Sequence, residues 1–209
     1  RENSAPADMI FEDMTENDVN ALIKNAPYLE KTYLTREDIG LLFPDTYFYE
    51  YGQDSSVIIN KAKKKMEIIS SYIWENRDKS IPIKTIHELI VVASMLQAEV
   101  KTIDDMKVVA GIIYNHLNYN MLLEIDSTLL YGFNREQFVL TDKMVNNDYN
   151  TYINYGLPIT PISFPGINAL KGASKPIKTN YLYYIAFDDY FIPAYTEKDH
   201  NNNINIYLK

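Results

Sequence analysis

The chain has 209 residues, 46 % of them hydrophobic, which suits one large domain or one domain with a small companion. Its formal net charge of −8 argues against a general nucleic-acid binder, and the basic cluster KAKKK (61–65) is typical of a solvated helix face. Because the chain has no cysteine, disulfides, thiolate nucleophiles and cysteine-bound metals are excluded.

The first half of the chain is predicted to be helical. Residues 1–45 are a polar lead followed by short helical pieces, with too few apolar residues for a core of their own. Apolar periodicity then predicts helices over about 55–78, 83–100 and 103–119. Thr102 and Asp105 fit a capping box at the start of the third of these helices.

The second half changes in texture. Residues 121–133 predict a strand, a turn and the start of a helix, and residues 148–166 predict an ordered loop rich in Gly, Pro, Asn and Tyr. A short helix is expected over 167–176, followed by a hairpin with strands at 181–187 and 191–196. Helices followed by antiparallel strands predict an α+β fold, with a helical first half packed against a small antiparallel sheet.

Glu99 is an outlier in the predicted helix over 83–100. Its near neighbours Met95 and Leu96 are apolar, and burying a charge there is costly unless the charge is paired or neutralised. A carboxyl group among apolar neighbours has a raised pKa, which suits a general acid near neutral pH. The alternative is a buried glutamate paired with lysine, arginine or backbone amides.

Other reaction types lack their motifs. The chain has no G-x-G-x-x-G, no Walker loop and no G-x-S-x-G, and His87-Glu88 fails as a zinc motif because Val91 occupies the fifth position. A two-carboxylate glycosidase needs a second acid near the first. Glu88 lies about 16 Å away along the helix axis and is a poor partner. Asp126 and Glu124 would have to fold back toward Glu99 to act as a second acid, so one-carboxylate and two-carboxylate mechanisms both remain open.

Several motifs, taken in order, resemble the MltG (YceG-like) endolytic murein transglycosylases, and the resemblance covers about residues 40–209. It implies a YceG-like catalytic domain over 41–209, preceded at 1–40 by the end of a LysM-like module or a linker. The motifs are LLFPDTYFY (41–49), ASMLQAE (93–99), YNHL (114–117), MLLEIDSTLLYG (121–132), YNTYINYGLP (149–158), SFPG (163–166) and KTNYLYYIA (178–186).

The resemblance implies that Glu99 is the catalytic acid/base. The expected reaction cleaves the MurNAc–GlcNAc β-1,4 bond of peptidoglycan and closes a 1,6-anhydro ring on MurNAc, with no water consumed and no cofactor or metal. Asp126 has an alternative role as a turn or cap residue, and Tyr149, Asn150 and Tyr152 could instead pin the loop. The expected substrate-binding residues are Glu124, Asp126, Tyr149, Asn150, Thr151 and Tyr152.

The chain departs from the family pattern at Met106, His116 and Glu124, where the family usually has Arg, Arg and Gln. These departures motivate an alternative function, a catalytically weakened peptidoglycan-binding scaffold. His200 matches a late family position and is not expected to be catalytic.

The resemblance also implies partners and a location. The expected partners are peptidoglycan glycan strands and cell-wall synthases, with no nucleic acid. The expected location is the cell envelope, in the periplasm or at the outer face of the cytoplasmic membrane. Because the sequence has no apolar run of 18 residues, a single-pass anchor is expected upstream of residue 1.

Overall fold

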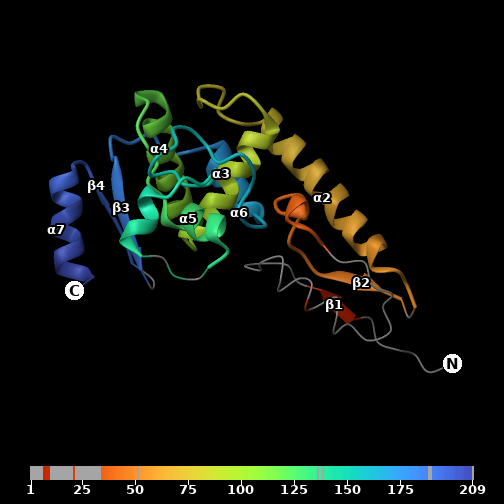
Figure 1. The fold of residues 1–209 in the computed structure, drawn as a ribbon. Coiled ribbons are helices and arrows are strands. Elements are labelled where there is room, and N and C mark those ends of the chain that lie inside the picture. Colours follow the sequence, from red (N-terminus) through yellow and green to blue (C-terminus); the bar gives the residue numbers. More distant parts are fainter. Residues whose placement is uncertain are drawn as a thin grey trace.

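The computed structural model describes residues 7–9, 21, 34–50, 52–135, 137, 139–187 and 190–208. Within them helices predominate, accompanied by two small antiparallel sheets, which confirms the predicted α+β class (Figure 1). The elements in chain order are β1 (Ala7–Met9), η1 (Arg36–Asp38), β2 (Tyr47–Tyr49), α2 (Ser55–Glu75), α3 (Ile86–Glu99), α4 (Ile103–Tyr119), α5 (Asp126–Phe133), η2 (Leu140–Met144), α6 (Ile167–Ser174), β3 (Tyr183–Phe187), β4 (Tyr190–Ala194) and α7 (Glu197–Tyr207).

Helix α3 forms the centre of the main core. Every residue from 89 to 96 is buried, as expected for a helix that is apolar on nearly all sides. Helices α4 and α6 pack against it. The approach of α6 to α4 is close at Gly172, where an added Cβ would lie 2.9 Å from the Cβ of Met106. Met106 is itself buried, so this departure from the family pattern has a packing role.

Helix α2 lies on the opposite side of the molecule from α7 (Figure 1) and contributes to a second buried cluster. The lysines of the KAKKK segment do not join it. Lys63 pairs with Asp38 at 2.5 Å and Lys64 with Glu67 at 2.8 Å, as expected for a solvated helix face. The cluster itself consists of Leu34, Ile39, Leu42, Tyr47, Tyr49, Ile58, Ile59, Ala62 and Phe164.

The predicted hairpin is present as β3 and β4. The strands are antiparallel with Tyr183 opposite Ala194 and Tyr184 opposite Pro193, and within the described residues each strand has one strand neighbour. A proline, which has no N–H, is tolerated there because a two-stranded sheet consists of edges. Helix α7 packs on this hairpin, so the hairpin lies between α7 and the central helices (Figure 1).

Helix boundaries differ from the sequence expectation where caps decide them. Helix α3 begins at residue 86 rather than 83 because Thr85 and Glu88 form a capping box, with the Glu88 N–H donating to the Thr85 hydroxyl at 3.1 Å. Helix α2 ends three residues early, where the Asn76 amide donates to the Tyr72 carbonyl oxygen at 2.8 Å.

The strand expected at the start of 121–133 is absent. Asn120 and Glu124 have positive φ angles of 52° and 54°, which interrupt an extended course on both sides of residues 121–123. The helix expected in this region is present as α5.

Two expectations about the first part of the chain stay predictions. Of the short helical pieces expected within residues 1–45, those before residue 34 lie outside the described residues, apart from Ala21. The division at residue 40 stays a prediction as well. Strand β1 pairs with β2, so a segment from before this boundary is in contact with one from after it.

Of the helices described, none combines the length and apolar character needed to span a bilayer.

Candidate active site

Glu99 is the last residue of α3, and the chain turns away from the helix directly after it. Val100 has an extended backbone (φ −146°, ψ 153°). Helix α4 begins shortly afterwards because the Thr102 hydroxyl accepts from the Asp105 N–H at 3.2 Å and donates to the Asp105 carboxylate at 2.6 Å. This confirms the predicted cap. The Glu99 side chain thus stands at the end of a buried helix and remains partly exposed.

The surroundings of Glu99 raise the pKa of its carboxyl group, chiefly because burial removes water from it. The charge of Asp126 also raises this pKa. Two hydroxyl groups oppose the effect without cancelling it. Tyr184 donates a hydrogen bond to Oε2 at 2.8 Å, and Ser127 lies against the carboxyl group, although its hydroxyl falls short of full hydrogen-bond geometry. Glu99 therefore keeps its proton to a higher pH than an exposed glutamate.

The alternative for Glu99 is a buried glutamate paired with lysine, arginine or backbone amides. Only its last part has a counterpart here, because the backbone N–H of Ser127 lowers the pKa of the Glu99 carboxyl group without cancelling its rise. Among the residues that the structure describes, no lysine or arginine forms an ion pair with its carboxyl group, and Tyr184 donates a hydrogen bond to it. Glu88, the other carboxylate on α3, is engaged in the capping box with Thr85. The arrangement suits a carboxyl group that gives and takes a proton.

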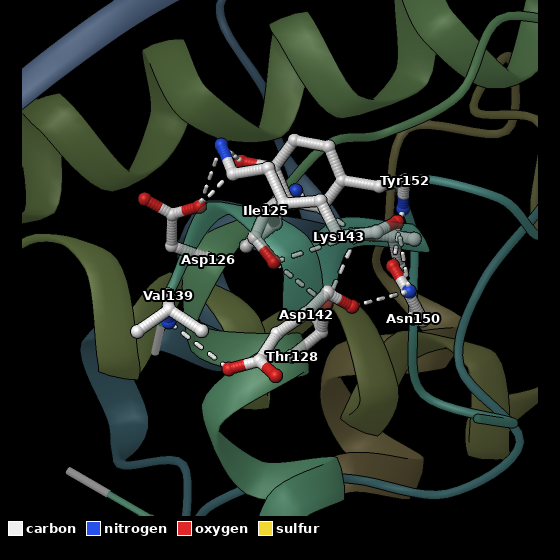
Figure 2. A network of polar contacts seen from close by, with 9 residues as sticks. Ile125, Asp126, Thr128, Val139, Asp142, Lys143, Asn150 and Tyr152 are labelled. Carbon is white, nitrogen blue, oxygen red and sulfur yellow. Dashed lines mark hydrogen bonds and ion pairs between the residues drawn. The ribbon is translucent and has the colours of Figure 1, made fainter. Parts of the chain in front are cut away.

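Asp126, Tyr152 and Lys143 form a polar network beside Glu99. The Tyr152 hydroxyl donates to Oδ1 of Asp126, and the Lys143 ammonium group lies 3.6 Å from the same oxygen. Lys143 also donates to the Tyr152 hydroxyl at 2.8 Å and lies 4.0 Å from the centre of its ring. Figure 2 shows these side chains converging. Because the Asp126 charge acts on Glu99, the network and Glu99 belong to one site.

Asn150 and Thr151 hold the loop that carries Tyr152. The Asn150 side chain is fully buried and donates to three carbonyl oxygens between residues 142 and 145, at 2.9–3.4 Å (Figure 2). The Thr151 hydroxyl accepts from the Ile125 N–H at 2.9 Å and shares a hydrogen bond with Thr128 at 2.9 Å. The structure thus favours the loop-pinning alternative for Asn150 and gives Thr151 a similar role.

Tyr149 and Glu124 differ in their surroundings. The Tyr149 hydroxyl shares a hydrogen bond with Thr160 at 2.7 Å, and its half-buried ring meets Tyr131 edge-on, which also fits loop pinning. Glu124 is exposed, and its N–H donates to the Thr151 carbonyl oxygen at 3.1 Å. Its charge contributes to the raised pKa of Tyr152, which puts it close to the polar network.

The two histidines near the site have structural contacts. His116 has its two ring nitrogens at 2.7 Å from the carbonyl oxygens of Leu122 and Leu182, and so joins α4 to the segments before α5 and β3. His200 stacks on the ring of Tyr183 at 5.5 Å. His116, where the chain departs from the family pattern, therefore connects three of the segments that surround the site.

Sequence reasoning missed Tyr184, Ser127 and Lys143. Tyr184 belongs to an aromatic and apolar strand, and strand alternation separates it from buried Ile185 without saying which face meets α3. Ser127 lies in a motif that was recognised, next to Asp126, but nothing in its pattern marks it. Lys143 lies in η2, where no spacing signal links it to the later loop.

By fold and site, the chain is an α+β protein with one partly exposed carboxyl acid at the end of its central helix. The model of the YceG-like family matches residues 3–206, so the chain belongs to the YceG-like family. A crystal structure of a yceG-like protein from Listeria monocytogenes has the same fold. It has a TM-score of 0.76 and 24 % identity, and the match covers 96 % of this chain and 77 % of that one.

Two curated relatives carry the name endolytic murein transglycosylase. The protein from Bacillus subtilis (strain 168) is 31 % identical over 174 residues, which are 81 % of this chain and 48 % of the relative. The protein from Streptococcus pneumoniae (serotype 2, strain D39) is 27 % identical over 175 residues, which are 79 % of this chain and 31 % of that relative. The chain thus spans about half of the first relative's length and about a third of the second's.

Proposed function

We propose that this chain is the catalytic part of an endolytic peptidoglycan lytic transglycosylase. The observation that carries the proposal is Glu99, a partly exposed residue whose carboxyl group has a raised pKa and no ion pair to lysine or arginine among the described residues. The names of the relatives from Bacillus subtilis and Streptococcus pneumoniae support the same activity. The substrate is the peptidoglycan glycan strand, and the bond is the β-1,4 bond between MurNAc and GlcNAc.

Glu99 serves first as the acid and then as the base. Its proton passes to the glycosidic oxygen, so the bond from that oxygen to C1 of MurNAc breaks and the GlcNAc leaves with a hydroxyl group. The C6 hydroxyl oxygen of the same MurNAc then bonds to C1, and its proton returns to the Glu99 carboxylate. The product ends in 1,6-anhydroMurNAc, and no water is consumed.

The glycan contacts are assigned to the polar residues around Glu99. Asp126 is 51 % exposed on its side chain, and Glu124 is exposed as well, so both are available to sugar hydroxyl groups. Tyr152 orients Asp126 through their hydrogen bond. The roles of Asn150, Thr151 and Tyr149 are indirect: they hold the loop that carries Tyr152.

The proposal includes a cellular setting. The protein acts in the cell envelope, in the periplasm or at the outer face of the cytoplasmic membrane, held there by a single-pass anchor upstream of this chain. Cell-wall synthases are its proposed protein partners. The word murein in the names of the two relatives supports the envelope setting.

Digestion of purified glycan strands followed by mass spectrometry tests the proposal, with wild type compared with Glu99→Gln. Wild type should release fragments with anhydro ends, and Glu99→Gln should lose at least about 100-fold of this activity because the acid is gone. Glu67→Gln, on the exposed face of α2, is the matched control and should keep wild-type activity. Anhydro products that survive Glu99→Gln would refute the assignment. Glycan binding without turnover by wild type would support the scaffold function instead.

A hydrolytic muramidase is the second candidate, and the proximity of Asp126 to Glu99 favours it. The two carboxylates interact electrostatically, so Asp126 could activate a water molecule while Glu99 protonates the leaving group. Asp126→Asn separates the two functions. In a muramidase it abolishes products with reducing ends, whereas in a transglycosylase anhydro ends still form, at a rate that reflects weaker glycan binding.

A further inference from the structure

The hydrogen bond from the Tyr184 hydroxyl to Oε2 of Glu99 joins residues 85 positions apart at 2.8 Å. We propose that Tyr184 is a positioning residue of this site: it holds one carboxyl oxygen of Glu99 and leaves proton exchange with the glycan to the other oxygen. The inference rests on the proposed function and deepens it, because it names the residue that orients the acid.

Hydrogen bonds from α4 hold the backbone of residues 179–182, which lead into β3. The Asn115 side chain donates to two carbonyl oxygens between residues 179 and 181, at 2.9 and 3.0 Å. The ring of His116 contacts the Leu182 carbonyl oxygen at 2.7 Å. Helix α4 therefore sets the position of β3, and β3 in turn sets the position of the Tyr184 hydroxyl relative to α3.

The ring of Tyr184 has its own packing site. It lies 5.7 Å from the ring of Phe191 on β4, and both rings pack against the main core. Phenylalanine has the same ring, so Tyr184→Phe removes the hydroxyl group and keeps this packing. The substitution therefore isolates the hydrogen bond to Glu99.

The Tyr184 hydroxyl serves as a donor and does not itself give up its proton. Burial, followed by the charge of Glu99, raises the pKa of Tyr184 well above its ordinary value of 10.0. A hydrogen bond to a charged carboxylate is stronger than one to a neutral acid. The contact thus strengthens as the other oxygen of Glu99 gives its proton to the glycosidic oxygen, and it weakens again when the C6 hydroxyl proton returns.

The first experiment follows the titration of the Glu99 side chain by carboxyl ¹³C NMR in the glycan-free protein, with the signal assigned through Glu99→Gln. Tyr184→Phe should raise the midpoint of the titration, because the carboxylate loses a donor. Tyr190→Phe, an exposed tyrosine on the same hairpin, should leave the midpoint unchanged. An unchanged midpoint in Tyr184→Phe, with an unchanged melting temperature, would overturn the inference. This measurement does not depend on glycan cleavage, so it separates a failure of the inference from a failure of the proposed function.

The second experiment compares the pH dependence of glycan cleavage in the same three proteins. Tyr184→Phe should lower kcat by about 10- to 100-fold, as expected for losing a hydrogen bond to a developing charge. The fall of activity at high pH should move to higher pH by as much as the NMR midpoint moves. A lower kcat with an unmoved pH profile would show a merely structural contact and would also overturn the inference. If wild type cleaves no glycan, the proposed function fails, and the NMR titration still decides whether Tyr184 controls Glu99.

Discussion

The features that suit Glu99 to proton transfer also make it unfavourable for folding. Its carboxyl group loses water on folding, so the charged form is less favourable in the folded than in the unfolded protein, as the raised pKa states. A group with a raised pKa in the folded state contributes stability below its unfolded pKa and loses that contribution as the pH rises through the folded pKa. At neutral pH, which lies above the ordinary pKa of glutamate, the raised pKa of Glu99 therefore lowers the stability of the folded protein.

We predict that Glu99→Gln makes the protein more stable at pH 8. Glutamine can accept from Tyr184 as glutamate does, but it carries no charge to desolvate. The advantage should shrink as the pH falls and should vanish below 4.5, the ordinary pKa of glutamate, where both proteins are neutral at this position. Urea unfolding of both proteins across this pH range checks the prediction. A variant that is less stable than wild type at pH 8 would contradict it.

Helices α4 and α6 approach each other closely at Gly172, where a glycine leaves room for the neighbouring helix. An added Cβ at Gly172 would lie 2.9 Å from the Cβ of Met106 and 3.3 Å from its backbone carbonyl carbon. Neither atom belongs to a flexible side-chain end, so the helices would have to move apart. Glu99 lies on α3, which packs against α6, so the spacing of these helices also supports the site.

We predict that Gly172→Ala lowers the free energy of unfolding by about 1–3 kcal/mol, because overpacking outweighs the better helix propensity of alanine. Chemical denaturation measures the change. Lys171→Ala, at an exposed position of the same helix, is the control and should change stability by no more than about 0.5 kcal/mol. An unchanged or raised stability in Gly172→Ala would show that α6 can shift without cost.

For the molecule as a whole, local signals predicted local structure well. The apolar pattern, the Thr102 cap and the strand signals at 181–187 and 191–196 predicted α3, α4 and the hairpin, because each rests on neighbours a few residues apart. Contacts over long distances in the chain were not predictable. Nothing in the pattern of β3 says that Tyr184 reaches Glu99, and nothing in η2 says that Lys143 reaches Asp126.

In the candidate site, too, local sequence signals were informative and contacts between distant residues were not. Glu99 stood out because a single helix turn already surrounds it with apolar residues, and the motif resemblance then gave it a role. The polar loop residues were harder to interpret, since sugar binding and loop pinning favour the same residue types. Burial favours loop pinning for Asn150, which has no exposed surface. A sequence without an alignment carries no measure of that burial.

The proposed reaction needs one acid, Glu99, held in position by the packed helices. It cleaves the glycan strand without water. Digestion of glycan strands by wild-type protein in H₂¹⁸O, with mass spectrometry of the new ends, measures this requirement directly. The account predicts 1,6-anhydroMurNAc ends that carry no ¹⁸O. New reducing MurNAc ends that each carry one ¹⁸O would contradict it, because water rather than the C6 hydroxyl group would then have attacked C1.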